Sequence, residues 1–227
     1  MIGDPLARPV WSALTGPQSA LALRHGQAVR IDPEIGFFAA TGEPGVASKD
    51  LAEITRSVAR ASWLLEEVPI ACRPGLVLRR TARLTQMIAI KPELTPDIEG
   101  IVALGEEAAA EMFALAHATE PGPWESRTHR YGGYYGIHEH GRLVAMAGTR
   151  LRPAANLAEV SGVCTYPEAR GRGHARRLMI RVMRDMAERG ETPFLHCWSS
   201  NTAAIALYRT LGFEISRELS VSIVEAE

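Results

Sequence analysis

Long apolar runs, a strong net charge and a secretion signal are all missing from this sequence. No segment of the 227 residues approaches the ~18 consecutive apolar residues that a membrane-spanning helix requires. The N-terminus lacks the charged, apolar and small-residue regions of a signal peptide. The formal net charge is only -1, whereas binding to DNA would require a broad basic surface. We therefore expect a cytoplasmic protein that binds neither membrane nor nucleic acid.

Cysteine is also scarce. Cys72, Cys164 and Cys197 are odd in number and have no metal-like spacing, which argues against a secreted disulfide scaffold. His138 and His140 lie close together in the sequence, but no third ligand of matching type is near them. We therefore expect reduced cysteines and no metal site.

The chain can nevertheless bury a full hydrophobic core, because 46% of its residues are hydrophobic. Its length suits one large domain or two small ones. Residues 91–96 contain two prolines that interrupt the hydrophobic pattern, and we place a domain boundary there. The predicted units are an α/β lobe of unassigned role at residues 1–95 and a second domain at residues 96–227.

Within the first lobe, the residue pattern predicts helices and strands. A proline in the first turn favours a helix over residues 17–24, and Ser48 is a candidate N-cap for a helix that ends before Pro69. Residues 76–78 and 84–90 have the character of strands. The lobe carries no motif to which a chemical role can be assigned.

The C-terminal half contains a strand, a glycine turn and a helix in succession. Residues 160–165 form a short apolar run with β-branched residues, ended by Pro167, which predicts a buried strand. Gly171 and Gly173 follow, and apolar residues then recur at the spacing of one helical face up to Met186. Backbone N–H groups in such a turn, with the unpaired N–H groups and dipole of a helix N-terminus, bind phosphate. We therefore expect an anion site at this turn.

Two common nucleotide-binding turns do not fit this stretch. A P-loop requires a lysine followed by Ser or Thr after its last glycine, whereas His174-Ala175-Arg176 follows here. A dinucleotide-binding turn requires a third glycine at position 176 and an acidic residue ending the next strand, and residues 194–201 contain none. Residues 170–189 carry seven arginines against two acidic residues, an excess that suits a polyphosphate ligand.

Two segments resemble the signatures of the GNAT superfamily of acyl-CoA N-acyltransferases. Residues 170–175, Arg-Gly-Arg-Gly-His-Ala, match its Gln/Arg-x-x-Gly-x-Gly/Ala turn, which in that family cradles the pyrophosphate of coenzyme A. Residues 201–213 resemble the second signature, an asparagine and a tyrosine on the next helix. Residues 144–148, 163–165 and 193–196 are most similar to the branch related to glycine N-acyltransferases.

This resemblance covers roughly the C-terminal 130 residues, a domain-sized span. It implies an α/β protein with a mixed sheet and a GNAT fold in the C-terminal half. In the glycine N-acyltransferase-like branch the N-terminal half is a second, degenerate α/β lobe, and residues 1–95 are a candidate for one. The alternative for the glycine turn is a tight connection that binds no ligand.

The resemblance also implies a site for coenzyme A. Gly162 favours a bulge that would separate its strand from the one expected at residues 194–198 and leave a wedge for the pantetheine arm. In the family, backbone groups matching Val163 and Thr165 bond this arm, and the N–H matching Val163 polarises the thioester oxygen. The implied cofactor residues are Val163, Cys164, Thr165, Arg170, Gly171, Arg172, Gly173, His174, Ala175, Asn201 and Tyr208.

Candidate catalytic residues follow from the same resemblance. Tyr208 would be the general acid for the departing sulfur, and its spacing from Asn201 places both on one helix face. Glu159 matches the catalytic glutamate of some family members and would remove a proton from the amine, a task that suits a buried carboxylate with a raised pKa. His196, on the opposite strand, is the rival base. The alternatives are a core tyrosine at position 208 and an exposed glutamate at a strand edge.

The connection over residues 121–135 is rich in aromatic and basic side chains. In GNAT enzymes this segment walls the acceptor pocket, which makes Trp124, Arg127, Tyr131 and Tyr134 candidate substrate contacts; the alternative is that the aromatics pack in the core and the charges face water. The predicted activity is direct transfer of an acyl group from acetyl-CoA, or another acyl-CoA, to a primary amine of a small molecule or peptide, by a monomer or homodimer. A CoA-sensing protein without turnover is the alternative.

Overall fold

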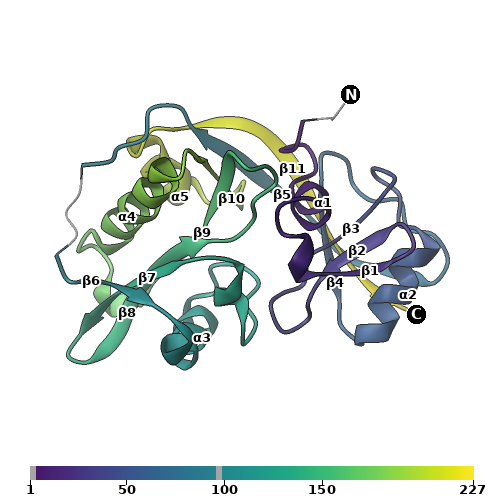
Figure 1. Ribbon diagram of the computed structural model, residues 1–227, viewed down its shortest axis with the longest axis horizontal. Helices are drawn as coiled ribbons and strands as arrows, with labels where there is room; N and C mark the ends of the chain where they lie inside the picture. Colours follow the sequence, from purple (N-terminus) through teal and green to yellow (C-terminus); the bar gives the residue numbers. More distant parts are fainter. Residues whose placement is uncertain (1–3, 96–98) are drawn as a thin grey trace.

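The computed structural model describes residues 4–95 and 99–227 as two lobes joined by long strands (Figure 1). The helices are α1 (Pro9–Thr15), α2 (Lys49–Val58), α3 (Ala109–Thr119), α4 (His174–Glu188) and α5 (Thr202–Thr210). The strands are β1 (Ala22–His25), β2 (Ala28–Ile31), β3 (Ala39–Thr41), β4 (Ser62–Glu66), β5 (Leu76–Ala89), β6 (Ile101–Leu104), β7 (Tyr134–Glu139), β8 (Arg142–Thr149), β9 (Leu157–Thr165), β10 (Thr192–Trp198) and β11 (Phe213–Ala226). None of the helices in these ranges is long and apolar enough to cross a membrane.

The strands form two sheets, a small one of β1, β2 and β3 and a larger one in the order β4-β11-β5-β10-β9-β8-β7-β6. In the larger sheet β9 and β10 are parallel, and the other neighbours are antiparallel. The sheet is therefore mixed, as predicted.

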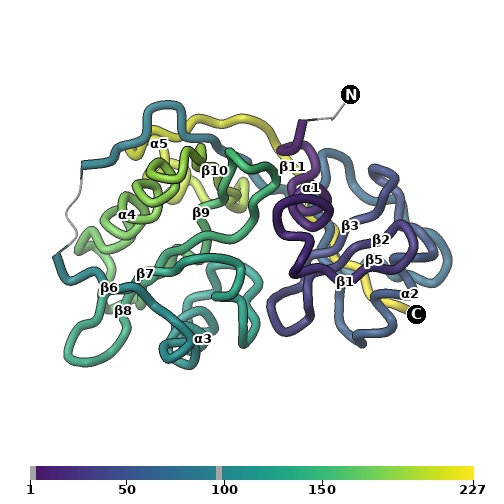
Figure 2. The backbone as a smooth tube through the Cα atoms, in the orientation of Figure 1, coloured from purple at the N-terminus to yellow at the C-terminus, as the bar shows by residue number. Residues whose placement is uncertain are grey.

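Two long strands belong to both lobes. β5 and β11 are 14 residues each and pair along their whole length, from Leu76 opposite Ala226 to Ala89 opposite Phe213. One end of this ribbon pairs with β4 in the first lobe, and the other end pairs with β10 in the second. β11 therefore carries the C-terminus back beside α2, at the far end of the first lobe (Figure 2).

The predicted boundary between residues 95 and 96 does not divide the large sheet. β5 precedes that boundary, yet it lies between β10 and β11, which follow it. The two stretches expected as separate strands, at 76–78 and 84–90, belong to one continuous strand, β5. This strand ends at Ala89, so Ile90 lies outside it. Residue 96, the predicted start of the second domain, lies outside the described residues.

Local sequence explains the helices of the first lobe. Pro9 occupies the first position of α1, where its missing N–H costs no hydrogen bond. Ser48 caps α2 as predicted, because its Oγ accepts a hydrogen bond from the N–H of Leu51 at 3.2 Å. The helix expected over residues 17–24 is wrong, since that segment forms a short 3₁₀ turn and then β1.

The two faces of the second lobe's sheet are covered by different helices. Ala145 and Ala147 of β8 pack in one apolar cluster with the buried side of α4, whereas Met146 between them packs with α3. α4 presents the apolar face that the sequence pattern predicted, including Leu178, Val182 and Met186. This packing fixes the N-terminus of α4 at the edge where β9 ends.

β9 and β10 separate halfway along their length, as the resemblance implied. They pair only from Thr192 opposite Leu157 to Phe194 opposite Glu159. Beyond that point the pairing of β9 with β8 shifts register, and Gly162 has a left-handed backbone with φ +62°. The bulge predicted at Gly162 is therefore present, and it opens a wedge between the two strands.

Gly162→Ala is expected to lower the free energy of unfolding by about 3 kcal/mol. The new Cβ would lie 2.8 Å from Tyr134 Cε1 and 2.9 Å from Trp124 Cζ3, in a backbone conformation that alanine disfavours. Gly141→Ala is the matched control for chemical denaturation, because Gly141 also has positive φ but open space around it. Equal losses in both variants would contradict the close-packing argument.

Candidate active site

A cavity of about 370 Å³ lies where β9 and β10 separate. Its walls come from the ends of these strands, the starts of α4 and α5, and the segment that follows α3. Phe38, Trp63 of β4, Leu84 of β5 and Val221 of β11 complete the lining. The first lobe thus forms part of the same cavity as the glycine turn of the second.

The glycine turn leaves its backbone accessible. Gly171 and Gly173 both have φ +78°, and a Cβ built on either would meet no atom within 4 Å. Gly173 is the N-cap of α4 and supplies no side-chain cap, so the first N–H groups of this 15-residue helix are not capped by it. Arg170 and Ala175, on either side of the glycines, line the cavity. This geometry suits an anion held by main-chain N–H groups and by the helix dipole.

The side chains of Arg172 and His174 point away from the cavity. Both contact Glu139 at the end of β7, with Arg172 NH1 2.6 Å from Oε2 and His174 Nε2 3.0 Å from Oε1. These contacts, that of His174 first, lower the pKa of Glu139. These side chains therefore brace the turn, and the binding of a pyrophosphate by the backbone of residues 171–175 stays a prediction.

Val163, Cys164 and Thr165 line the cavity at the bulged end of β9. Thr165 Oγ1 is buried and has no hydrogen-bond partner among the described residues, so a polar ligand in the wedge would satisfy it. Burial raises the pKa of the Cys164 thiol to about 12 and that of Cys197 to about 11. Both cysteines therefore remain protonated at neutral pH, as the interpretation of buried strand residues expects.

Asn201 and Tyr208 reach the same cavity from α5. Asn201 also caps the helix, because its Oδ1 accepts a hydrogen bond from the N–H of Ala204 at 3.1 Å. Burial raises the pKa of Tyr208 to about 12, so this hydroxyl keeps its proton throughout the physiological range. A protonated phenol beside the wedge has the form that a general acid requires.

Glu159 does not meet the requirements set for a general base. It is fully buried and forms a bidentate ion pair with Arg150. Oε2 of Glu159 lies 2.9 Å from Arg150 Nε, and Oε1 lies 2.7 Å from NH2. Burial alone would raise the pKa of Glu159, but Arg150 and then His196 lower it well below its ordinary value. The expectation of a raised pKa is therefore wrong, because a buried guanidinium, and not an apolar wall, faces the carboxylate.

His196 is held at both ring nitrogens. Its Nδ1 lies 2.7 Å from Glu159 Oε1, and its Nε2 lies 2.9 Å from Gln86 Nε2. Gln86 Nε2 also donates to the carbonyl of Leu6 at 3.0 Å, which fixes the amide orientation. The network therefore assigns a neutral imidazole that donates from Nδ1 to Glu159 and accepts at Nε2 from Gln86. His196 lines the cavity, but its lone pair is already used.

The four predicted acceptor contacts do not line this cavity. Trp124, Tyr131 and Tyr134 are buried, and Trp124 packs edge-on against Tyr134 with ring centroids 5.2 Å apart. Arg127 forms a surface ion pair with Glu34 at 2.7 Å. The three aromatics thus pack in the core, but Trp124 and Tyr134 also line a smaller pocket that shares Arg150 and residues 121–123 with this cavity, so their contact with an acceptor stays a prediction. The segment still contributes to the cavity, but through residues 119–123 just before them.

Several cavity residues were not identified from the sequence. Phe38, Trp63 and Trp198 are single aromatics in strand-like or irregular stretches, and only the fold brings them together. Glu120 offered a weak signal, because it closes a helix directly before a Pro-Gly-Pro turn. Arg150 is the buried partner of Glu159, and nothing in the sequence shows that pairing.

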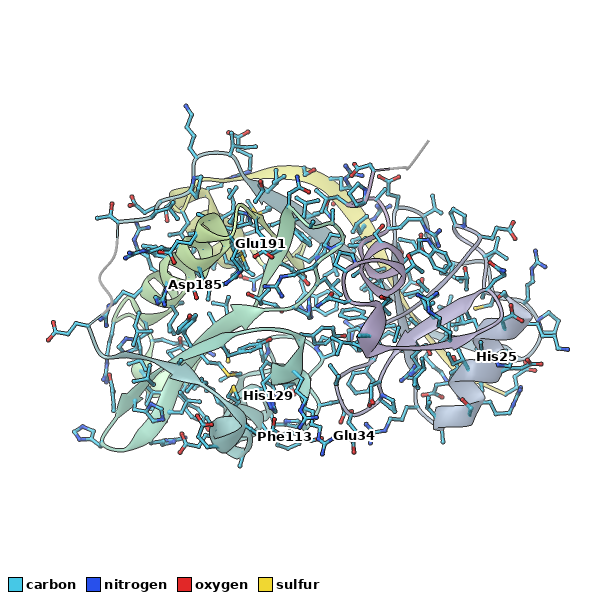
Figure 3. All side chains as sticks on the ribbon, viewed as in Figure 1. His25, Glu34, Phe113, His129, Asp185 and Glu191 are labelled. Atoms are coloured by element: carbon cyan, nitrogen blue, oxygen red, sulfur yellow. The ribbon has the colours of Figure 1, made fainter. Side chains whose placement is uncertain are left out.

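The two histidines considered as metal ligands lie at the β7–β8 hairpin, and His138 pairs with a carboxylate. His138 Nε2 lies 2.9 Å from Glu111 Oε2, and His140 forms the β7–β8 turn with φ +51°. In the described residues, His25, Asp50 and Glu53 do place their polar atoms within 4.8 Å of one another. That group lies at the outer end of the first lobe and does not belong to the cavity lining (Figure 3).

Comparisons with known proteins agree with this geometry. A family model described as FR47-like protein matches residues 134–221. The solved structure of a protein from the GNAT family of Novosphingobium aromaticivorans is 52% identical, covers 99% of both chains and has a TM-score of 0.93. A GCN5-related N-acetyltransferase from Kribbella flavida shares the fold at 19% identity over 97% of this chain and 95% of its own, with a TM-score of 0.64.

Curated relatives match between 36% and 48% of this chain. N-alpha-acetyltransferase RimI of Mycobacterium tuberculosis is 41% identical over 83 residues, which are 36% of this chain and 51% of the relative. The aligned segments span 32%, 37% and 51% of the three curated relatives compared. None of these relatives is described as a glycine N-acyltransferase, so that branch stays a prediction. The full-length match, the fold and the cavity together show that this chain belongs to the GNAT family.

Proposed function

We propose that this protein transfers an acetyl group from acetyl-CoA directly to a primary amine, with both substrates bound at once. The observation that carries the proposal is a single cavity lined by the glycine turn, the β9 bulge and Tyr208, and also by the aromatic residues of the first lobe. One cavity of this form can hold the carrier at one part of its lining and the amine at another. We expect no covalent acyl-enzyme on Cys164 or Cys197, because both thiols stay protonated and are poor nucleophiles.

The residues present fit coenzyme A. The backbone of residues 171–175 would hold the pyrophosphate, because the two glycines project no side chain into the open space. The wedge beside Val163 exposes strand backbone that can pair with an extended pantetheine arm, and Thr165 Oγ1 is left without a partner until a polar ligand arrives. The thioester of acetyl-CoA supplies an acyl group on a fair leaving group, a thiol with an ordinary pKa near ~8.5.

Protons and bonds balance as follows. The new N–C bond forms while the C–S bond breaks; the amine gives one proton to water before attack and another after it. The departing sulfur takes the hydroxyl proton of Tyr208, and solvent returns that proton to the phenol. In this proposal the N–H of Val163 polarises the carbonyl, and the Glu159–His196 pair fixes the wall of the cavity and is a positioning device.

The test is release of free thiol from acetyl-CoA in the presence of an amine panel, together with thermal stabilisation by acetyl-CoA alone. We expect both signals. Stabilisation without thiol release for any amine would favour the CoA-sensing alternative, whereas absence of both would overturn the cofactor assignment.

Tyr208→Phe is expected to lower kcat about tenfold and to leave the Kd for acetyl-CoA nearly unchanged. The loss is modest because a thiolate departs fairly well without help. Since the pKa of Tyr208 is about 12, wild-type kcat should show no downturn from this group below pH ~11. Tyr135→Phe, outside the cavity lining, is the control. An unchanged kcat in Tyr208→Phe would remove the tyrosine from the mechanism.

A further inference from the structure

The first lobe contributes an apolar chamber to the cavity. We call Phe38, Trp63, Leu84, Trp198 and Val221 the aromatic chamber; all five line the cavity. Leu84 stands opposite Trp198 in the β5–β10 pairing, and Phe38 bridges to Trp63, so neighbouring backbones hold these side chains in place. Phe38 and Val221 are almost fully buried. The chamber is thus a preformed surface, suited to a flat apolar group.

Two of the charged groups beside the chamber, Arg150 and Glu159, are paired with each other. Arg150 is neutralised by Glu159, and the same carboxylate and Gln86 occupy both nitrogens of His196. Arg150 also lies over the Phe38 ring, 4.9 Å from its centroid, and Arg80 lies over Trp198 at 5.5 Å. A ligand ammonium would therefore find no unpaired carboxylate at the aromatic end, because Glu159 is already bound by Arg150 and His196.

One carboxylate in the cavity lining has no ion-pair partner among residues 4–95 and 99–227. Glu120 ends α3 with a left-handed backbone at φ +48°, a conformation that normally favours glycine. It is exposed and directly follows Thr119, whose hydroxyl helps to lower the pKa of Cys164 against the larger effect of burial. Glu120 therefore lies close in sequence to the residue that contacts the β9 wedge, where acetyl transfer would occur.

We infer that the acceptor is a primary amine carried on a planar apolar body, with the ring in the aromatic chamber and the ammonium at Glu120. This inference rests on the proposed function and names the substrate class of that site. Glu120 would hold the ammonium, which gives its proton to water before attack. Short hydrophilic amines, polyamines and aliphatic amino acids would leave the chamber unfilled.

Binding measurements test this inference apart from turnover. Titration calorimetry with the CoA-saturated protein would compare 2-phenylethylamine with ethylamine and with spermidine. We expect 2-phenylethylamine to bind at least tenfold more tightly than either. Trp63→Ala should weaken binding of 2-phenylethylamine about tenfold, while thermal stabilisation by acetyl-CoA persists. Trp11→Ala, outside the cavity lining, should not change this binding.

Glu120→Gln tests the contribution of the ligand's charge apart from that of its ring. This variant should weaken binding of 2-phenylethylamine about fivefold and leave binding of the neutral analogue 2-phenylethanol unchanged. The inference would be overturned if ethylamine and 2-phenylethylamine bound equally, or if Trp63→Ala bound 2-phenylethylamine as tightly as wild type. The proposed function would still stand in either case, provided that acetyl-CoA stabilised the protein. A Glu120→Gln effect on both analogues would also overturn the role of its charge. If acetyl-CoA did not stabilise the wild-type protein, that result would instead contradict the proposed function itself.

Discussion

Glu159→Gln is expected to lower the free energy of unfolding by about 3–5 kcal/mol. The variant keeps the size of the side chain but removes the charge that compensates Arg150. Burial alone would lower the pKa of Arg150, and the Glu159 carboxylate reverses that effect and raises it above its ordinary value. Without Glu159 an unpaired guanidinium would remain in a nearly buried position, with 12% of its side chain exposed. Urea denaturation followed by circular dichroism measures the loss.

The matched control is Glu106→Gln. Glu106 also pairs with an arginine and a histidine, Arg130 and His129, but 61% of its side chain is exposed. Solvent screens such a pair, so the loss of stability should be far smaller than in Glu159→Gln. If Glu159→Gln cost no more than Glu106→Gln, the Arg150–Glu159 pair would not be the buried structural pair inferred here.

At acid pH, the difference in the free energy of unfolding between wild type and Glu159→Gln should become smaller. The pKa of Glu159 is lower in the folded state than its unfolded value of about 4.3, so its stabilising effect is fully present above that pH. Below it the unfolded chain takes up the proton first, and the advantage falls by about 1.4 kcal/mol per pH unit until the folded pKa is reached. Urea midpoints at pH 7 and pH 3 check this sign, and a gap that widens in acid would contradict it.

Gly173→Val is expected to weaken acetyl-CoA binding at least a hundredfold. Gly173 is the N-cap of α4, with φ +78°, and its missing side chain leaves the space in front of the first helical N–H groups empty. A branched side chain would fill that space and would also push the backbone out of the left-handed region. Several main-chain hydrogen bonds to the pyrophosphate would be lost together.

Gly190→Val provides the control for strain. Gly190 follows the other end of α4, has φ +71°, and also has no atom within 4 Å of a built Cβ. Both variants should therefore lose similar stability, and only Gly173→Val should lose acetyl-CoA affinity in titration calorimetry. Wild-type affinity in Gly173→Val would mean that the pyrophosphate does not lie on this turn.

The local features of the fold could be predicted because single residues determine them. Ser48 caps α2, Gly162 produces the bulge, and the glycines before α4 form the open turn, each through the conformation or hydrogen bond that its own residue type favours. The extent of the sheet could not be predicted in this way. β5 inserts between β10 and β11, and long-range pairing of this kind leaves no periodic signal in the sequence.

The same distinction applies to the candidate site. Asn201 and Tyr208 were expected to share a cavity because helical spacing relates them, and they do. Glu159 was misjudged because its pKa depends on Arg150, which reaches it across a turn from β8 to β9, and the sequence does not reveal burial. The aromatic chamber was missed because its members come from five different segments.

The ribbon of β5 and β11 limits how the catalytic half could be transplanted. A fragment that begins after residue 95 would retain β10 and β11 but would lack β4 and β5, so β11 would lose both of its partners and β10 would expose an unpaired edge. Such edges recruit other chains and favour aggregation. Protein engineers who wish to move the second lobe into another scaffold would therefore have to carry residues 76–89 with it, or close the gap by circular permutation.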